Sequence, residues 1–365
     1  MQKESLVVLF GGRSNESEIS VITGALACSA LKGVKESVLP VYMGRDGEFY
    51  TDDCLADVRF FRRPDFSKIK RAIFSNGNMF LITARGKIKG KIKVKCIINC
   101  CHGGVGENGA ISGLASACNI PLASASVAES AILCDKYLTK LFAKSIGVKT
   151  APYVYLKNGY CEEELQKIEY PCVVKPCALG SSIGVVKVDD ESSLKSALDT
   201  AFLYDDGVIV EKFLDGKREL NCACYRGENG VVASEIEEVF SSGDLLSYDD
   251  KYAGQGKREM PAKLDEITKN KVKDTAKKIY SYLNMHGIVR FDFFLCGKKI
   301  YLIEGNAVPG SLSNYLLSNS QKEFGCLLQR LVAVALRERE QNKKKMIVST
   351  GILNNFMPSN ACKLK

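Results

Sequence analysis

The segment from 287 to 306 constrains this chain more than any other, because it places charged side chains within a strongly apolar pair of strands. Residues two apart in a strand share a face, so Arg290 and Asp292 point the same way. A tight turn brings Asp292 opposite Glu304, with Asn306 on the same face as Glu304. Burial of such groups is costly unless they are paired or hold a cation. The segment therefore predicts either a structural ion pair between Arg290 and Asp292 or a site for a hard cation such as Mg²⁺ or Mn²⁺.

The composition is that of a globular protein with two or three domains. The chain has 365 residues, of which 46% are hydrophobic and 25% charged, and this balance excludes a disordered chain, a collagen and a coiled coil. No apolar run reaches the roughly 18 residues that span a bilayer, and the N-terminus lacks the pattern of a signal peptide. We therefore expect a cytoplasmic protein with no membrane partner.

Cysteine, histidine and charge exclude further classes of function. The 15 cysteines are scattered through apolar segments without the paired spacing of zinc sites, so we expect reduced thiols rather than disulfides. Only two histidines are present, which excludes a histidine-rich metal site. The net charge is +9, and the densest basic run, residues 87–95, alternates Lys with apolar residues. This alternation indicates a half-buried strand with a solvated face rather than a nucleic-acid-binding patch.

Strand and helix patterns follow one another along the chain and predict a mixed α/β protein. The predicted strands are 6–10, 35–43, 96–101, 153–156, 172–175, 208–213, 218–226, 231–240, 288–295 and 299–303, and the predicted helices are 18–31, 127–146, 191–204, 264–284 and 322–341. Residues 45–95 are expected to form a peripheral, strand-rich elaboration of the first βαβ unit. The polar segment 241–262 is too long for a simple connector and is expected to be a functional loop.

A second candidate site follows the apolar strand that ends at Lys175. The Gly/Ser-rich loop at 178–184 can wrap phosphate oxygens with backbone N–H groups and hydroxyls, while the lysine supplies positive charge. The residue order is not that of a Walker loop, and taken singly such a loop is often only a turn. Lys136, in an upstream helix, would by itself be interpreted as a surface lysine.

A third candidate site lies at the end of another strand. Glu211 and Lys212 end this strand, and Glu219 follows in the next one. Their donors and acceptors could hold an adenine edge and ribose hydroxyls. The alternative interpretation is an exposed ion pair between Glu211 and Lys212.

Taken in chain order, these features resemble the ATP-grasp architecture, in which two α+β units hold ATP between them. The N-terminal motifs narrow the resemblance. The segments Gly11–Ser20, His102–Gly109, Tyr248–Tyr252 and Glu304–Gly310 are similar to those of the D-alanine–D-alanine ligase family of bacterial cell-wall synthesis. The resemblance extends over residues 5–340.

The resemblance implies an α/β (α+β) ATP-grasp fold preceded by a Rossmann-like βαβ domain. The implied units are an N-terminal domain at 1–124 with the 45–95 elaboration, a central lid domain at 125–213, a C-terminal domain at 214–345 with the metal site and a mobile loop at 241–262, and a tail at 346–365. It also implies a cytoplasmic homodimer that acts on ATP and D-alanine.

The implied reaction joins two D-alanine molecules for peptidoglycan precursor synthesis and releases ADP and phosphate. ATP phosphorylates the carboxylate of the first amino acid, and the amine of the second attacks the acyl phosphate. Charge spreads over phosphoryl and carboxylate oxygens, which two Mg²⁺ (or Mn²⁺) ions and Lys and Arg side chains would stabilise. A closing lid would keep water away from the acyl phosphate.

The resemblance also implies a role for each matching residue. ATP would be held by Lys136, Lys175, Ser182, Glu211, Lys212, Leu214 and Glu219, and the two metal ions by Asp292, Glu304 and Asn306. The residues implied in catalysis are Glu16, Ser181, Tyr252, Arg290 and Gly310. Among them, Glu16 would meet the first ammonium group, and Arg290 with the Gly310 amide would stabilise the tetrahedral oxyanion. Lys251 would reach the transferred phosphoryl group, and the residues implied at the second substrate are His102, Tyr315 and Leu316.

Several positions depart from the family's pattern. Asn108 stands where an acidic residue is usual, Ser112 stands where Gln is usual, and residues 121–126 lack the usual glycines. In the loop that binds the second substrate, Tyr315 replaces a serine whose hydroxyl is expected on the substrate carboxylate. A tyrosine hydroxyl lies further from its backbone, so the subsite must be reshaped. The ATP and metal groups are intact, so the pattern fits altered acceptor specificity better than loss of catalysis.

Two alternatives stay open. A ligase that joins D-alanine to D-serine or to another small amino acid fits the altered loop, while the retained Lys251–Tyr252 pair argues against a D-lactate acceptor. A non-catalytic paralogue that only binds nucleotide fits less well with the intact acidic hairpin. A stabilising shift with MgATP but no ADP release with any amino acid would favour the paralogue.

Overall fold

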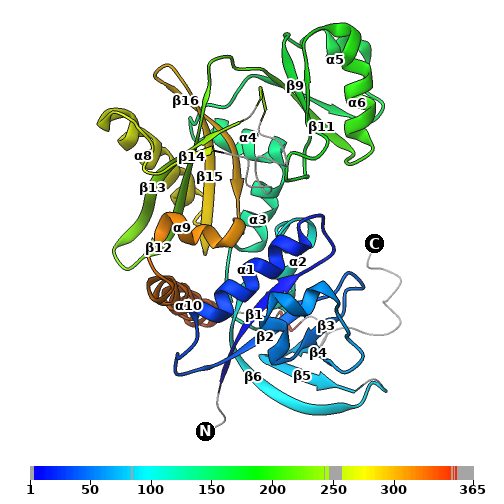
Figure 1. The fold of residues 1–365 in the computed structure, drawn as a ribbon, viewed down its shortest axis with the longest axis vertical. Coiled ribbons are helices and arrows are strands. Elements are labelled where there is room, and N and C mark those ends of the chain that lie inside the picture. The colour runs from blue at the N-terminus through cyan, green and yellow to red at the C-terminus, as the bar shows by residue number, and fades with distance from the viewer. Residues whose placement is uncertain are drawn as a thin grey trace.

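The computed structural model (Figure 1) describes residues 4–83, 85–241, 243–245, 257–346, 348 and 350–351. Within these residues the strands form three sheets, which lie in an N-terminal, a central and a C-terminal unit. The mixed α/β architecture that the sequence predicts is confirmed. The division into domains at 124 and 213 stays a prediction.

The N-terminal sheet is built on a parallel βαβ unit. Strands β1 (Ser5–Gly11) and β2 (Ser37–Met43) pair in parallel around α1 (Ser17–Ala30), and β6 (Ile88–Asn99) pairs with the other edge of β1. The residues of β1 are all buried, because its alternate side chains enter two different cores on the two faces of the sheet. Gly24 allows α1 to approach closely, since an added Cβ would lie 2.3 Å from the Phe10 ring.

The 45–95 elaboration extends this sheet with antiparallel strands. These are β3 (Phe49–Thr51), β4 (Lys70–Ser75) and β5 (Asn78–Ile82). Two short 3₁₀ turns, Asp53–Ala56 and Val58–Arg62, lie between β3 and β4. The basic run forms the outer half of β6, where Lys89, Lys91 and Lys93 are exposed. The prediction of a strand with a solvated basic face is therefore confirmed.

The predicted helix at 127–146 is wrong in one respect, because the chain forms two helices there. After β7 (Leu122–Ala123) come α3 (Val127–Cys134) and α4 (Lys136–Ser145), separated by Asp135 in an extended conformation. The Asp135 carboxylate accepts the Leu138 N–H at 2.9 Å and so caps α4. The break places Lys136 at the start of α4, where its backbone N–H donates to the Cys177 carbonyl of the central unit at 3.0 Å. The helix α2 (Ala110–Ala117) precedes β7.

The central unit is an antiparallel sheet covered on one side by helices (Figure 1). Its strands are β8 (Tyr153–Lys157), β9 (Cys172–Pro176), β10 (Val186–Val188) and β11 (Gly207–Lys212), in the order β10-β9-β11-β8. Its helices are α5 (Glu162–Leu165) and α6 (Leu194–Phe202), with a 3₁₀ turn at Glu191–Ser193. Leu194, Leu198 and Ala201 of α6 pack on Val174 and Val208 to form the core of this unit.

The C-terminal sheet carries the acidic hairpin. Its order is β14-β13-β12-β15-β16, from β12 (Arg218–Gly227), β13 (Gly230–Phe240), β14 (Lys257–Glu259), β15 (Ile288–Cys296) and β16 (Lys299–Asn306). The helix α8 (Glu266–Tyr282) packs on it, and the buried Tyr280 donates its hydroxyl to the Gly287 carbonyl at 2.8 Å.

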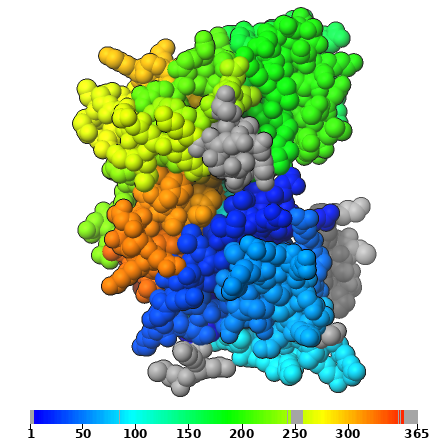
Figure 2. Space-filling model, in the orientation of Figure 1, coloured from blue at the N-terminus to red at the C-terminus, as the bar shows by residue number. Residues whose placement is uncertain are grey.

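The chain then returns to the N-terminal unit. A 3₁₀ turn at Gly310–Ser313 and α9 (Asn314–Leu317) lead into α10 (Gln321–Lys343). Phe324 and Leu328 of α10 lie in the same core as Leu6 and Val8 of β1. Figure 2 accordingly shows the orange C-terminal residues lying directly against the blue N-terminal unit. None of the helices in the described part of the chain is long and apolar enough to cross a membrane.

Candidate active site

A cleft of about 650 Å³ lies where the three units meet, and most of the predicted site residues line it. The predicted residues in its wall are Glu16, His102, Lys136, Ser181, Glu219, Arg290, Asp292, Glu304, Asn306, Gly310 and Tyr315. They come from every unit, so the fold brings together side chains that are far apart in the sequence.

The acidic hairpin has the register that its sequence predicts. Asp292 pairs with Glu304 across β15 and β16, and Arg290 pairs with Asn306. The Arg290 guanidinium donates to both oxygens of Asp292, at 2.7 and 2.8 Å, and the Asn306 amide donates to the same carboxylate at 3.1 Å. The structural ion pair between Arg290 and Asp292 is thus present, and Glu304 lies beside it in the cleft wall.

The hairpin's oxygen atoms fit a hard cation. Two carboxylates and one amide oxygen, carried by Asp292, Glu304 and Asn306, are the ligand types that Mg²⁺ and Mn²⁺ prefer. Among the described residues, no group of three or more His, Cys, Asp or Glu side chains is arranged to hold a metal ion without further ligands. A cation at the hairpin would therefore need additional oxygens, such as those of phosphate groups.

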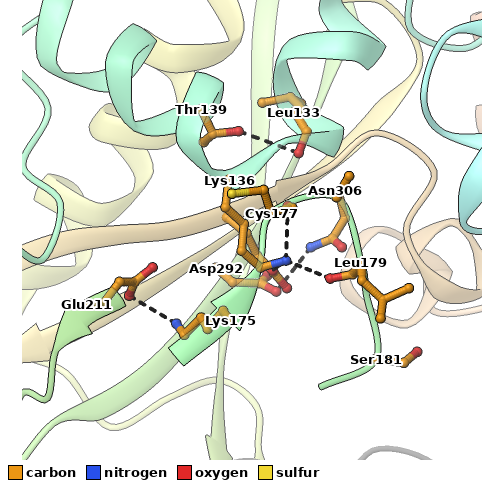
Figure 3. A network of polar contacts seen from close by, with 12 residues as sticks. Leu133, Lys136, Thr139, Lys175, Cys177, Leu179, Ser181, Glu211, Asp292 and Asn306 are labelled. Atoms are coloured by element: carbon orange, nitrogen blue, oxygen red, sulfur yellow. Dashed lines mark hydrogen bonds and ion pairs between the residues drawn. The ribbon is translucent and has the colours of Figure 1, made fainter. Parts of the chain in front are cut away.

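Lys136 is directed into the cleft rather than onto the surface. Its ammonium group donates to the Leu179 carbonyl at 2.6 Å (Figure 3) and lies 4.0 Å from the Glu304 carboxylate. The side chain is buried, since α4 begins directly beneath the Gly/Ser loop. Its positive charge is therefore held next to the acidic hairpin from a different unit.

Glu211 forms a buried charged cluster with two lysines, Lys175 of β9 and Lys140 of α4. Glu211 Oε2 lies 3.0 Å from the Lys175 ammonium (Figure 3), and Glu211 Oε1 lies 3.2 Å from the Lys140 ammonium. Burial would raise the pKa of Glu211, but the two ammonium groups outweigh burial and hold this pKa below its ordinary value. The alternative of an exposed Glu211–Lys212 pair is wrong, because Lys212 pairs with Glu169 instead.

Sequence reasoning missed Lys140, although a signal was available. Lys140 follows Lys136 by four residues on α4, and residues four apart lie on one face of a helix. Its side chain is 0% exposed, and a fully buried ammonium group is stable only beside a carboxylate.

Glu16 and the Gly/Ser loop meet across the cleft. The Ser181 hydroxyl donates to the Glu16 carboxylate, which joins the N-terminal unit to the central one. Ser181 and Ser182 both have positive φ, near +56° and +59°. Gly103 makes room for Glu16, since an added Cβ would lie 2.7 Å from its Oε2 atom.

His102 holds the backbone of the loop at 308–311 rather than pointing freely into the cleft. Its Nδ1 lies 2.7 Å from the Val308 carbonyl, which can only accept, so this nitrogen donates. In the neutral ring Nε2 then accepts from the Thr23 hydroxyl at 2.8 Å, and the Thr23 oxygen accepts the Ser311 N–H at 3.0 Å.

The residues after Gly310 have an unusual backbone conformation. Ser311, Leu312 and Ser313 all have φ near +50°, the left-handed region that non-glycine residues rarely adopt. Such residues persist only where surrounding contacts hold them. The buried Thr23 of α1 supplies one of these contacts and was not predicted from the sequence.

Tyr315 of α9 contacts a row of polar side chains that crosses the C-terminal sheet. Glu237, Asn221, Asp292 and Glu304 are directly opposite one another on β13, β12, β15 and β16. The Tyr315 hydroxyl and the Asn221 amide donate to Glu237 Oε2 at 3.2 and 3.1 Å. Sequence reasoning did not include Glu237 or Asn221, because only the register of four strands brings them to the acidic hairpin.

The remaining predicted residues lie elsewhere. Lys212 and Leu214 line a separate hollow of about 550 Å³ beside Tyr153 and Tyr301. Leu316 is buried in the core shared with α10. Lys251 and Tyr252 lie outside the described residues.

Comparisons with known proteins agree with this geometry. The family model described as D-ala D-ala ligase N-terminus matches residues 5–125, and the one described as D-ala D-ala ligase C-terminus matches residues 142–337. A D-alanine–D-alanine ligase of Thermosipho africanus is 36% identical over 93% of this chain and 95% of its own length.

Solved structures show the same fold. The D-alanine–D-alanine ligase of Helicobacter pylori is 31% identical, with a TM-score of 0.76 over 90% of this chain and 98% of its own. The VanG D-Ala:D-Ser ligase of Enterococcus faecalis has a TM-score of 0.78 over 92% of this chain and 100% of its own, but at 24% identity this likeness shows the fold alone.

Proposed function

Because the chain belongs to the D-alanine–D-alanine ligase family, we infer that it is an ATP-dependent ligase that joins two D-alanine molecules through an acyl phosphate, for peptidoglycan precursor synthesis. One observation carries this function in the structure. A single cleft holds the acidic hairpin, Lys136 beside Glu304, and the Glu16–Ser181 contact. A phosphoryl donor, a metal ion and an amino acid could therefore meet there.

ATP is proposed to lie between the central and C-terminal units. Lys136 and Lys175 would bind phosphate oxygens, with Ser182 in the loop over them, and Glu219 would accept from the ribose. The family resemblance assigns adenine to Glu211 and to the backbone at Lys212 and Leu214. In the structure Glu211 contacts Lys175, which is assigned to phosphate, whereas Lys212 and Leu214 line the neighbouring hollow.

Two Mg²⁺ ions are proposed at the acidic hairpin, with Mn²⁺ as the substitute. Asp292, Glu304 and Asn306 would hold them together with phosphate oxygens. When bound, the ions would neutralise the charge that develops on the transferred phosphoryl group. Arg290 keeps Asp292 oriented through its two hydrogen bonds, so the ligand geometry is set before ATP binds.

In the first step the chain's own residues would orient the donor amino acid. Glu16 would bind its ammonium group, and Ser181 would hold Glu16 in position. A carboxylate oxygen of the amino acid then attacks the γ-phosphorus of ATP, the bond to the β,γ-bridging oxygen breaks, and ADP leaves. Lys251 and Tyr252 are proposed to reach this site from the loop at 241–262 and to exclude water.

In the second step the amine of the acceptor attacks the acyl carbonyl, and phosphate leaves. The tetrahedral oxyanion would receive hydrogen bonds from Arg290 and the Gly310 N–H. His102 acts indirectly in this account, because Nδ1 binds the Val308 carbonyl of the loop that presents Gly310, and Nε2 binds Thr23, which in turn accepts the Ser311 N–H of the same loop. Leu316 would position the same loop through its buried side chain.

A second candidate reaction differs only in the acceptor, which would be D-serine or another small amino acid. The observation in its favour is Tyr315, which lines the cleft in place of the family's serine and donates its hydroxyl to Glu237. We also propose that the enzyme acts in the cytoplasm as a homodimer through its N-terminal unit. Light scattering on the purified protein would measure the latter.

The role of the hairpin is tested by Glu304→Gln. The variant removes one charge that would face the metal ions while keeping the side chain's size, so D-alanine-dependent ADP release should fall to background with little change in the melting temperature. Glu228→Gln, in the exposed turn between β12 and β13, is the matched control and should retain wild-type turnover. Near-normal ADP release by Glu304→Gln would contradict the metal assignment.

A further inference from the structure

We propose that Lys140 is a positioning residue for ATP binding: it keeps the buried Glu211 carboxylate paired, so that Lys175 can leave Glu211 and bind a phosphate group of ATP. This inference rests on the proposed ATP site and deepens it, because it names the group that makes Lys175 available to the nucleotide. It follows from the charged cluster of Lys140, Lys175 and Glu211, in which two ammonium groups share one carboxylate.

Lys175 is held by Glu211 in this structure. Its ammonium group donates to Glu211 Oε2 at 3.0 Å (Figure 3). The strand register sets up this contact, because Lys175 pairs with Ile209, two residues before Glu211, and the two charged side chains are diagonal neighbours on one face of the sheet. Lys175 is not among the described residues that line the cleft, although residues 178–181 of the following loop are. A phosphate group in the cleft would therefore have to draw Lys175 away from Glu211.

Glu211 cannot be left without a cation. Its side chain is 4% exposed, and a buried carboxylate that loses its partner is strongly destabilising. If Lys175 were the one cation beside it, this cost would oppose ATP binding. The other oxygen of the carboxylate, Oε1, lies 3.2 Å from the ammonium group of Lys140. Glu211 therefore keeps a partner when Lys175 moves.

The surroundings of Lys140 suit a counterion that stays in place. Its side chain is 0% exposed, and its ammonium group lies 5.5 Å from the centre of the Tyr153 ring, which is directly opposite Glu211 in the sheet. Within the described part of the chain, this ammonium group has no hydrogen-bond partner besides its ion pair with Glu211. Burial lowers the pKa of Lys140 and the Glu211 carboxylate opposes this effect, so the charged form depends on Glu211.

The two lysines thus differ in what they can reach. Lys175 is 10% exposed and lies near the end of β9, just before the loop that lines the cleft, whereas Lys140 is enclosed on α4. When ATP binds, its phosphate group supplies a second anion to the cluster. Each ammonium group then has an anion of its own, Glu211 for Lys140 and phosphate for Lys175.

The test measures the Kd for MgATP by isothermal titration calorimetry without an amino acid, so that no turnover occurs. Lys140→Met removes the charge and keeps an unbranched apolar side chain, so Lys175 becomes the cation on which Glu211 depends. The Kd for MgATP should rise roughly 10- to 100-fold, which is part of the cost of leaving a buried carboxylate unpaired. Adenosine carries no phosphate, so its Ki as a competitor of ATP should not change. Lys144→Met, exposed on the same helix, is the matched control and should bind MgATP like the wild type.

A double variant separates this role from a loss of structure. In Lys140→Met/Glu211→Gln nothing holds Lys175 back, and Gln keeps a carbonyl oxygen in place of the carboxylate. The Kd for MgATP should return to within about threefold of the wild-type value. Lys140→Gln should weaken MgATP binding less than Lys140→Met does, and it carries the test if Lys140→Met does not fold.

Three results would overturn the role of Lys140. They are a Kd for MgATP in the single variants that stays within about threefold of wild type, an equal loss of adenosine binding, and a double variant that binds MgATP as weakly as Lys140→Met. The last two would show that Lys140 acts only through the fold. Failure of the wild type to bind MgATP would instead overturn the proposed ATP site, and this role with it.

Discussion

His286 is expected to make the stability of this protein depend on pH between about 6.5 and 9. The side chain lies between two carboxylates, with Nδ1 2.8 Å from Glu129 of α3 and Nε2 in contact with Glu338 of α10. It lies two residues before β15, which carries Arg290 and Asp292. Protonated His286 thus joins the acidic hairpin to the helix that leads to Lys136 and to the helix that crosses to the N-terminal unit.

The size of the effect follows from the pKa shift. Burial lowers the pKa of His286, but the two carboxylates outweigh burial and raise it from 6.5 to about 9. Each pKa unit corresponds to about 1.4 kcal/mol of differential stabilisation, so the charged form contributes about 3 kcal/mol to folding. Because the folded-state pKa is the higher one, this contribution is complete below pH 6.5, declines between pH 6.5 and 9, and is absent above pH 9.

The assay compares wild type with His286→Gln. Gln keeps a polar side chain but cannot carry the charge, so the difference in melting temperature between the two proteins should be largest at pH 6 and should shrink steadily toward pH 9.5. Far-UV circular dichroism can follow the transition, since the chain has no Trp. The pKa itself can be measured by NMR, because only two histidine side chains contribute signals.

Glu338→Gln is the control for the cause of the shift. Removing one of the two carboxylates should lower the pKa of His286 while leaving the imidazole in place. A melting-temperature difference that does not change with pH, or a His286 signal that titrates near 6.5 in the wild type, would refute this reasoning.

Two further predictions concern contacts that the sequence did not reveal. Thr23→Val removes the hydroxyl that links His102 to the Ser311 N–H, so the acceptor KM should rise while the KM for ATP stays constant. Thr23→Ser keeps the hydroxyl and should retain wild-type values in the same steady-state assay. Equal effects of Val and Ser would contradict the hydrogen-bond role. Glu211→Gln leaves the ammonium groups of Lys140 and Lys175 without a carboxylate and should destabilise the fold by about 3–5 kcal/mol at neutral pH. Lys140→Met leaves Lys175 with the carboxylate and should lower the stability less, as measured by thermal unfolding. A larger loss of stability in Lys140→Met than in Glu211→Gln would refute the account.

Local patterns were sufficient to predict the hairpin of the site. The alternation around Arg290 and Asp292, and the glycine that turns the chain at 297, determine both the strands and their register. The same is true of the basic outer half of β6. In each case the interacting residues are close in sequence, so the pattern and the contact coincide.

One local signal was present but was not used. Asp135 is a preferred N-cap residue directly before Lys136, and its carboxylate does accept the Leu138 N–H. Reading it as a cap would have divided the predicted helix at 127–146 correctly.

The contacts around the loop at 308–311 and around Glu237 could not be predicted, because they join residues far apart in the sequence. Thr23 meets Ser311 from the opposite end of the chain, and Arg258 meets Glu237 only through the pairing of β13 with β14. No spacing in the sequence indicates either contact. The replacement of the family's serine by Tyr315 was visible from the sequence. The hydrogen bond from the Tyr315 hydroxyl to the Glu237 carboxylate was visible only in the structure.

The central claim is that this chain forms a peptide bond between two amino acids at the expense of ATP. The most direct measurement is the mass of the products after purified protein is incubated with MgATP and D-alanine, with ADP quantified in the same sample. The account predicts D-alanyl-D-alanine and ADP in equal amounts. ADP release without dipeptide, or neither product while ATP is bound, would contradict it.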